Sequence, residues 1–390
     1  MRRRYILLLV LALLVSGCSF GAEETQPPTE PPEIPLETRP DQRQYPGVTL
    51  TFETLWAQDT PEASILVQAA DVFESRTGAE VKILWNGEGS GNADIIGMPV
   101  EKLTEHQESS MDLTLLAQEA GYDSRSHEIL RQQVIDSCGS LKGIPQVPYL
   151  EGLYYNADLL EMPPENWTDF LLSCEALQSA GFLPLTMDGA DALWMLELHL
   201  ERSVGVSGLR DLRYGGGWAE NAAAVEALEQ IAELKDFGYV GTGGERKMVL
   251  SNAAMVVCGN EDCRAMEQEL NLDIRWGVAP WPGTKDSGCR VTSDVLTISN
   301  TCGNPQAAFD FILLLTTGEF DQLRADLTSG IPADPANKCG ITGAMETLEK
   351  ASTMADTILG QSWCEMALNL WNGGYESGEE LAEALDELYG

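Results

Sequence analysis

A strand, a helix and a second strand form the first clear pattern, between residues 48 and 85. Apolar and polar residues alternate over 48–56, which predicts a β-strand with one buried face. Apolar residues then recur at helical spacing from Pro61, with Thr60 as the expected N-cap and Gly78 as the expected C-cap. Alternation returns over 81–85. The order strand, helix, strand favours a parallel sheet.

The loop after the first of these strands carries candidate site residues. In parallel sheets, ligands lie beyond the carboxyl ends of the strands. Trp56, Gln58 and Asp59 occupy that position. We therefore expect these three side chains near a ligand.

A long extended segment, residues 141–156, divides the helical patterns of the chain. Pro145 and Pro148 exclude a helix through its first half, and apolar and polar residues alternate from 147 to 153. A strand of this kind can leave one domain and enter another. Tyr149 and Glu151 would then lie where two domains meet, and clefts between domains are favoured ligand sites. An ordinary buried strand would show the same pattern.

The rest of the chain alternates between helical and extended patterns, as in α/β proteins. Strands are expected over 182–185 and 291–298, and apolar faces at helical spacing indicate several helices. The expected helices cover 171–180, 222–237, a segment starting at Asn304 (cap) and Pro305, and 379–388.

The N-terminus has the features of an export signal. Arg2, Arg3 and Arg4 precede an apolar run of eleven residues, 5–15, which is too short to span a bilayer comfortably. Residues 15–18, Val-Ser-Gly-Cys, resemble the bacterial lipobox, in which the cysteine thiol receives a diacylglycerol. We therefore expect a signal peptide over 1–17 and lipidation at Cys18. A plain signal peptide with an incidental cysteine is the alternative.

Residues 18–46 are expected to form the lipidated cysteine and a tether. Seven of the 28 residues from 19 to 46 are proline, and few are large and apolar. Proline-rich chains extend as polyproline II, at about 3.1 Å per residue. The segment would hold a folded domain several nanometres from the membrane.

Charge excludes one class of function and leaves others open. The 390 residues include 61 acidic and 24 basic side chains, for a net charge of −37, so binding to a phosphate backbone is not expected. Most of this charge is expected on the solvated surface, although it would also favour a cationic ligand.

Three scattered histidines give no zinc-site spacing, and neither a nucleophile elbow nor a phosphate loop is present. No metal, cofactor or catalytic role is expected. Eight cysteines besides Cys18 would permit disulfides in an exported protein, or remain free thiols.

Several ordered motifs together resemble the extracellular solute-binding proteins of family 1, the maltodextrin-binding-like receptors of ABC importers. They are Phe73-Glu74 with Thr77-Gly78, the strand Asn92–Ile96, Gly143-Ile144-Pro145 with Leu153–Asn156, the turn Pro163–Phe170, Ala253-Ala254-Met255 with Gly259, and the helix from Pro305. The resemblance covers residues 48–390, and it lies in the order and spacing of the motifs.

This resemblance implies a periplasmic-binding-protein-like α/β fold of type II, with two α/β lobes joined by hinge strands. The implied divisions are an N-terminal lobe over 47–150 that returns at 291–333, a C-terminal lobe over 151–290, and C-terminal helices over 334–390 that belong mainly to the C-terminal lobe.

The resemblance also implies a ligand site. A carboxylate accepts hydrogen bonds from sugar hydroxyls, and an aromatic ring matches the apolar face of a pyranose. The residues expected to bind ligand are Trp56, Gln58, Asp59, Asp94, Tyr149, Glu151, Trp194, Glu261, Trp281 and Trp363. Each has a structural alternative, such as a strand-end cap for Asp94 or a core position for Trp194.

Two departures from the family pattern affect the expected ligand. Glu261 stands where the family usually has a stacking tryptophan, which weakens the case for a long glucan. The segment 86–91 replaces a longer segment with an extra helix, so one rim of the cleft is expected to be cut back.

The expected function is an exported, lipid-anchored receptor on the outer face of the bacterial cytoplasmic membrane. It would be a monomer that captures a small solute, a carbohydrate by resemblance, and delivers it to the transmembrane subunits of an ABC importer. A receptor for a cationic or peptide-like solute, such as a polyamine or amino sugar, is the first alternative. An enzyme acting on surface glycans is the second.

Overall fold

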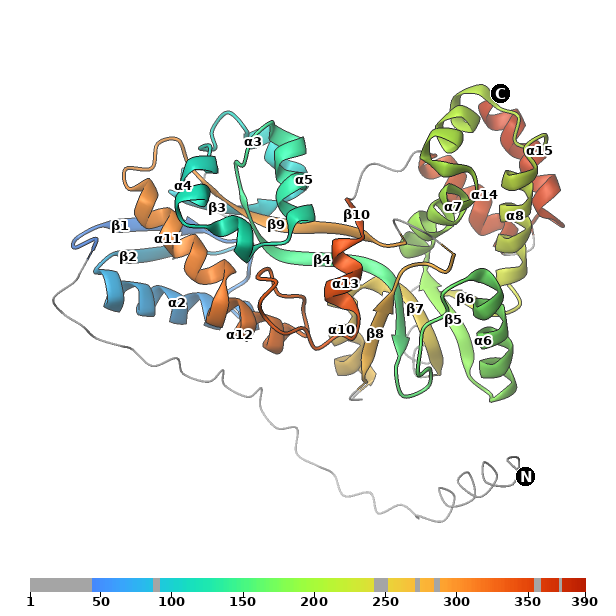
Figure 1. Cartoon of the computed structure of the whole chain (residues 1–390), viewed down its shortest axis with the longest axis horizontal. Helices are drawn as coiled ribbons and strands as arrows, with labels where there is room; N and C mark the ends of the chain where they lie inside the picture. Colours follow the sequence, from blue (N-terminus) through green and yellow to red (C-terminus); the bar gives the residue numbers. More distant parts are fainter. Residues whose placement is uncertain are drawn as a thin grey trace, which may run out of the picture. The chain divides into compact units, whose positions relative to one another are not determined.

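A computed structural model describes residues 44–86, 92–241, 252–270, 274–283, 288–353, 359–371 and 374–390 (Figure 1). The expected signal peptide, Cys18, nearly all of the tether and most of the shortened segment 86–91 lie outside the described residues. Among the described helices, none is long and apolar enough to cross a membrane.

The βαβ unit at the start of the fold is confirmed. Its elements are β1 (Thr49–Glu53), α2 (Pro61–Thr77) and β2 (Glu80–Leu84). The Thr60 hydroxyl accepts a hydrogen bond from the backbone N–H of Ala63, and Gly78 ends the helix with a φ of 80°. Both cap predictions are therefore correct, and β1 pairs with β2 in parallel as expected.

The ten strands of the described residues form one mixed sheet. The remaining strands are β3 (Ile95–Pro99), β4 (Ile144–Asn156), β5 (Leu183–Asp188), β6 (Gly238–Gly241), β7 (Ala253–Gly259), β8 (Trp276–Ala279), β9 (Arg290–Ile298) and β10 (Ser352–Thr353). Their order is β2-β1-β3-β9-β4-β7-β5-β6, with β10 paired to β9 and β8 paired to β4. Pairing is parallel at both ends and antiparallel from β3 through β9 and β4 to β7. The expectation of a parallel sheet is thus correct for the ends and wrong for the middle.

Strand β4 is the predicted extended segment, and it joins the two halves of the sheet (Figure 1). Its first half pairs with β9, from Ile144 opposite Leu296 to Glu151 opposite Arg290. Its second half pairs with β7 and β8. Gly152 lies at the change of partner, where an added Cβ would be 2.7 Å from the Sγ atom of Cys289. A glycine is required there because the side chains of Cys289 and Val278 leave no space for a Cβ atom.

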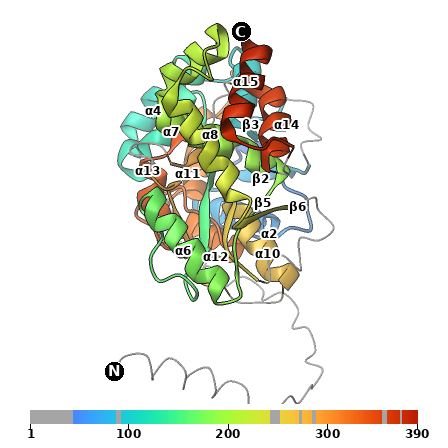
Figure 2. The ribbon, with the colours of Figure 1, turned by 90° about the vertical axis from the view of Figure 1, so that its right-hand side faces the viewer.

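Helices cover the sheet in two groups, each with its own hydrophobic core. The first group contains α3 (Leu103–His106), α4 (Thr114–Glu119), α5 (Glu128–Cys138), α11 (Pro305–Thr316) and α12 (Gly318–Thr328) with α2. The second contains α6 (Trp167–Ser179), α7 (Gly189–Gly215), α8 (Ala222–Leu234), α14 (Gly360–Trp371) and α15 (Gly378–Tyr389). Figure 2 shows the packing of α7, α8, α14 and α15.

These two groups define the lobes named below. The N-terminal lobe is centred on Phe73 and Phe311, whose rings meet edge to face with centroids 5.2 Å apart. The C-terminal lobe is centred on buried aromatic residues that include Trp218 and Phe170. A third cluster lies under β4, β7, β8 and two further helices, α10 (Asn260–Leu270) and α13 (Ala344–Glu349). The predicted domain boundaries stay predictions.

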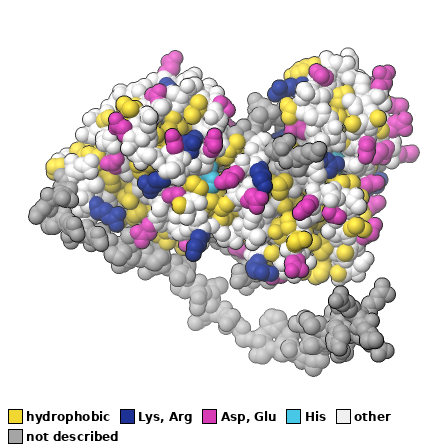
Figure 3. Space-filling model, in the orientation of Figure 1, with side chains coloured by type: hydrophobic (Ala, Val, Ile, Leu, Met, Phe, Trp, Pro, Cys, Tyr) yellow, Lys and Arg dark blue, Asp and Glu magenta, His cyan; other side chains and the backbone are white. Residues whose placement is uncertain are grey.

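Two further expectations can be compared with the structure. Asn304 occupies the N-cap position of the helix that begins at Pro305, as predicted, although its side chain makes no capping hydrogen bond. Among the described residues, six cysteines are free thiols: Cys138, Cys174, Cys263, Cys289, Cys302 and Cys339. On the face in Figure 3, acidic side chains are spread widely over the surface, as the net charge implies.

Candidate functional site

A cavity of about 170 Å³ brings together three of the predicted site residues. We name it the Trp56 cavity. It is lined by Trp56, Glu62, Val147, Tyr149, Asn260, Glu261, Arg324, Thr328 and Gly330. These residues come from the loop after β1, the first turn of α2, β4, the first turn of α10, and the end of α12 with the loop after it.

Trp56 and Glu62 reach the cavity from the N-terminal lobe. The loop at the carboxyl end of β1 holds Trp56, whose backbone N–H donates to the Thr54 hydroxyl at 3.2 Å and whose carbonyl accepts from the N–H of Asn86. Both side chains are half-buried. Glu62 lies in the first turn of α2, where the helix dipole favours a carboxylate.

Tyr149 forms the wall contributed by β4. Its hydroxyl donates a 2.8 Å hydrogen bond to Oδ2 of Asp294 on β9. Burial, followed by the nearby Asp294 carboxylate, raises the pKa of Tyr149 well above its ordinary value. The phenol is therefore neutral at physiological pH, and its hydroxyl remains a donor.

Asn260 and Glu261 begin α10 directly after β7. Oδ1 of Asn260, which is 2 % exposed, accepts a 2.6 Å hydrogen bond from the backbone N–H of Leu150. This bond fixes the start of α10 against β4. Glu261 is exposed as a whole residue, yet desolvation of its carboxyl group raises its pKa, and the carboxylates of Asp262 and Asp294 raise it further.

Arg324 approaches from α12 and is 3 % exposed. Its Nη2 atom donates to Oδ1 of Asp321 and to the carbonyl of Ile331, both at 2.8 Å. Oδ1 of Asp321 also accepts from the N–H of Ala333. The Nε atom of Arg324 has no hydrogen-bond partner among the described residues. Arg324 is thus a firmly held buried cation whose Nε–H is still available as a donor.

Together these groups suit a small polar ligand with an apolar face. The indole of Trp56 offers a stacking surface, and the carboxylates of Glu62 and Glu261 accept hydrogen bonds. Arg324 supplies a charged donor from a buried position. The cavity contains both donors and acceptors, as a ligand rich in hydroxyl groups requires.

Three predicted site residues of the N-terminal lobe do not line this cavity. Gln58 and Asp59 are exposed in the loop after Trp56. Asp94 lies beside Thr51, and its Oδ2 atom accepts from the Thr51 backbone N–H at 2.9 Å and from the hydroxyl at 2.8 Å. The Asp94 carboxylate therefore joins β1 to the start of β3, which is the structural alternative anticipated from the sequence.

Three predicted stacking residues lie in the core of the C-terminal lobe. Trp194, Trp281 and Trp363 are 6 %, 2 % and 0 % exposed. The Nε1 atom of Trp281 donates to Nδ1 of His199 at 3.0 Å. None of these three rings lines the Trp56 cavity.

Glu151 belongs to a separate polar group centred on Arg290, its partner across β4 and β9. The Arg290 guanidinium lies 3.9 Å from a carboxylate oxygen of Glu197 and 5.8 Å from the centre of the Trp194 ring. Burial raises the pKa of Glu151 to about 7, against the lowering effect of Arg290. Its Oε2 atom has no partner among the described residues.

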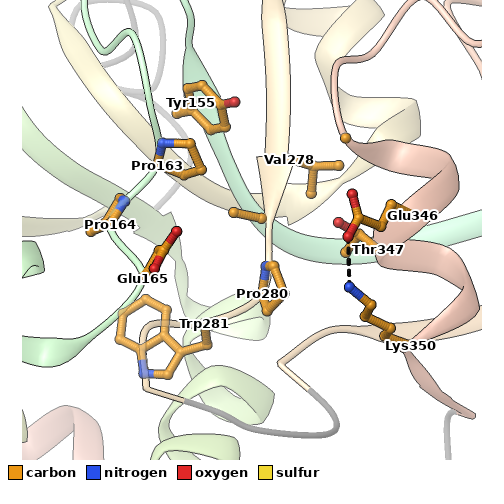
Figure 4. Close-up of a pocket in the computed structure, with 12 residues that line it drawn as sticks. Tyr155, Pro163, Pro164, Glu165, Val278, Pro280, Trp281, Glu346, Thr347 and Lys350 are labelled. Carbon is orange, nitrogen blue, oxygen red and sulfur yellow. Dashed lines mark hydrogen bonds and ion pairs between the residues drawn. The ribbon is translucent and has the colours of Figure 1, made fainter.

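A larger cavity, of about 380 Å³, lies beside β8 and is lined by residues 163–165, residues 278–281 and α13. Figure 4 shows its prolines, Tyr155 and Trp281 on one side and α13 on the other. Its polar residues include Glu346 and Lys350, which already form a 2.6 Å ion pair. Apart from Trp281, it contains none of the predicted site residues, so the Trp56 cavity is the stronger candidate site.

Sequence reasoning missed Glu62, Asn260, Arg324 and Thr328. For two of them the neighbouring residue was a signal. Glu62 directly follows Pro61, which starts the predicted helix beside Trp56, and Asn260 directly precedes Glu261, which was itself predicted to bind ligand. Arg324 and Thr328 lie on a helix more than 250 residues beyond Trp56, and no local pattern marks them.

The comparisons with known proteins agree with this architecture. A family model described as "Bacterial extracellular solute-binding protein" matches residues 91–338, more than half of the chain. No curated protein matches the sequence significantly.

Solved structures share the fold at low sequence identity. Apo RafE from Streptococcus pneumoniae is 17 % identical, with a TM-score of 0.66 over 88 % of this chain and 97 % of its own. A cyclo/maltodextrin-binding protein complexed with maltotetraose is 14 % identical, with a TM-score of 0.64 over 87 % and 96 %. The maltose-maltodextrin binding protein of Alicyclobacillus acidocaldarius is 17 % identical, with a TM-score of 0.56 over 87 % and 99 %.

The fold is therefore the maltodextrin-binding-like, type II periplasmic-binding-protein fold that the sequence motifs implied. With the family match covering residues 91–338, the chain belongs to the bacterial extracellular solute-binding proteins.

Proposed function

We propose that this protein is a receptor that captures a small carbohydrate in the Trp56 cavity and delivers it to an ABC importer. One observation carries the proposal. An aromatic face from the loop after β1, two carboxylates from α2 and α10, and a buried guanidinium from α12 converge on one cavity. Structural neighbours whose ligands are raffinose and maltotetraose support a carbohydrate.

Capture would depend on the strands that join the lobes. Trp56 and Glu62 belong to the N-terminal lobe, while Asn260 and Glu261 follow β7 on the other side of β4. A ligand that contacts both groups favours the arrangement in which they are closest, by its differential affinity for that arrangement. The strands β4 and β9 would act as the hinge.

Anchoring and delivery complete the proposal. Lipidation of Cys18 would attach the protein to the outer face of the cytoplasmic membrane, and residues 19–46 would act as the tether. The partners would be the transmembrane subunits of the importer, with the receptor as a monomer and without catalytic activity. Incorporation of radiolabelled palmitate into the wild-type protein, and its absence from the Cys18→Ala variant, tests the anchor.

A thermal-shift screen tests the ligand class. The full chain would be screened against sugars, amino sugars, polyamines and peptides. A ligand at 100 times its dissociation constant adds about 2.7 kcal/mol of stability. A sugar that raises the melting temperature of the wild type, but not of Trp56→Ala, supports the proposal. A response to polyamines or peptides alone would overturn the carbohydrate assignment.

A receptor for a cationic solute is the second candidate. Two carboxylates, Glu62 and Glu261, line the cavity, and Arg324, the cation among its described lining residues, is already paired with Asp321. Affinity for a cation would fall steeply with added salt, whereas affinity for a neutral sugar would not. An enzyme acting on glycans would instead turn over a labelled oligosaccharide.

A further inference from the structure

The Trp56 cavity offers a single indole ring for stacking. Trp56 and Tyr149 are its aromatic lining residues, and the Tyr149 hydroxyl is held by Asp294. The other tryptophans predicted to stack, Trp194, Trp281 and Trp363, are packed into the core of the C-terminal lobe. A chain of sugar rings gains affinity when each ring finds its own apolar platform. The described residues supply such a platform for one ring.

The volume of the cavity also limits the ligand. It measures about 170 Å³, whereas pockets for drug-sized ligands typically measure about 300–1,000 Å³. Side chains pack closely on the wall formed by α12 and the loop after it. An added Cβ at Gly330 would lie 2.7 Å from Oγ1 of Thr328 and 3.4 Å from Nη1 of Arg324. Backbone and side chains are already in close contact there.

Polar groups line separate walls of the cavity. Glu261 occupies the first turn of α10, and the bond from Leu150 to Asn260 holds that turn against β4. Arg324 is fixed by Asp321 and Ile331 on another wall. These groups suit hydroxyls on the rim of one ring, since the carboxylates accept and the guanidinium donates.

We infer that the site takes a single sugar ring, a monosaccharide, rather than an oligosaccharide. This inference rests on the proposed carbohydrate function and narrows its ligand class. One stacking surface, a small cavity and polar groups on separate walls carry it together.

Isothermal titration calorimetry on the full chain tests the inference. The probes are glucose, galactose, xylose and N-acetylglucosamine, each with its linear di-, tri- and tetrasaccharide. We expect at least one monosaccharide to bind, and its trisaccharide to bind no more than about threefold more tightly. A trisaccharide that binds more than tenfold more tightly than its monosaccharide would overturn the inference while leaving the carbohydrate receptor intact. If no sugar of any length binds, both the single-ring inference and the proposed carbohydrate function are wrong.

A pair of variants places the bound ring. Trp56→Ala should weaken binding of the monosaccharide by about tenfold or more, because the stacking surface is lost. Leu55→Ala is the matched control, since Leu55 is the adjacent residue, 40 % exposed and outside the cavity lining. It should change affinity by less than twofold. Unchanged binding by a Trp56→Ala protein with a wild-type melting temperature would contradict the single-ring site.

Discussion

The hydroxyl of Tyr149 donates a 2.8 Å hydrogen bond to Oδ2 of Asp294 and so links β4 to β9 beside the Trp56 cavity. Asp294 is 9 % exposed. Burial raises the pKa of this carboxyl group, and the hydrogen bond from Tyr149 opposes that rise. The same bond fixes the Tyr149 side chain, so one wall of the cavity is held in place before any ligand arrives.

Removing the Tyr149 hydroxyl should therefore reduce stability. In Tyr149→Phe, the Asp294 carboxylate loses its donor within a largely buried site, which costs about 1–2 kcal/mol of unfolding free energy. Urea denaturation measures the change. Tyr214→Phe is the control, because Tyr214 is 78 % exposed, and it should stay within about 0.5 kcal/mol of wild type. Equal effects of the two substitutions would contradict the role of the hydrogen bond.

Glu151 should make the protein less stable as the pH rises. Its pKa is raised from 4.5 to about 7 in the folded state, mainly by burial. Between these values the folded state binds more protons than the unfolded state, so the unfolding free energy falls with increasing pH. The full effect is up to about 3 kcal/mol.

Glu151→Gln separates this contribution from those of other carboxyl groups. The measurement is the unfolding free energy of wild type minus that of the variant, from pH 4 to pH 8. This difference should fall as the pH rises through 4.5 to 7 and then level off. Glu119→Gln, at an exposed position on α4, is the control. A difference that rises with pH would show that Glu151 is stabilised as an anion.

Asp321 should be among the most sensitive residues of the N-terminal lobe. It is fully buried, and it accepts hydrogen bonds from Arg324, from the N–H groups of Ala333 and Asp334, and from Asn337. Asp321→Ala leaves the Arg324 cation buried without its partner, which costs about 3–5 kcal/mol.

A neighbouring acid provides the comparison for that prediction. Asp326 lies on the same helix, is exposed, and accepts one hydrogen bond from Gln322. Asp326→Ala should cost less than about 0.5 kcal/mol. Thermal and urea unfolding of both variants measure the contrast. Similar melting temperatures would mean that Asp321 does not support Arg324 as the geometry indicates.

Trp281 should act on stability and not on ligand binding. It is 2 % exposed, and its Nε1 atom donates to His199. Trp281→Phe should cost about 1–3 kcal/mol, since it removes a buried hydrogen bond and part of a packed ring. Affinity for the bound monosaccharide should change by less than about threefold. A loss of affinity as large as that of Trp56→Ala would instead support the prediction that Trp281 stacks on the ligand.

Local patterns predicted the element types because caps and periodicity are local. Thr60, Pro61 and Gly78 delimit α2 through their own backbone geometry, and the prolines and alternation of β4 make it extended. Three cavity residues, Trp56, Tyr149 and Glu261, could also be found, because strand ends and the order of motifs indicate them.

Tertiary packing determined what the sequence did not show. A tryptophan on an amphipathic helix looks the same whether it faces a core or a ligand, and Trp194 and Trp363 face the core. Asp94 finds its partner in Thr51, 43 residues earlier, through strand pairing. Arg324 reaches the cavity because α12 packs against α2, a contact that no local pattern encodes.

A crystal structure of the full chain with the tightest-binding monosaccharide of the calorimetric series would test the central claim most directly. We expect one sugar ring stacked on Trp56, with hydroxyl groups within hydrogen-bond distance of Glu261 and of Nε of Arg324. A sugar bound elsewhere, for example in the cavity between Pro164, Trp281 and α13, with the Trp56 cavity empty, would contradict the assignment of the site.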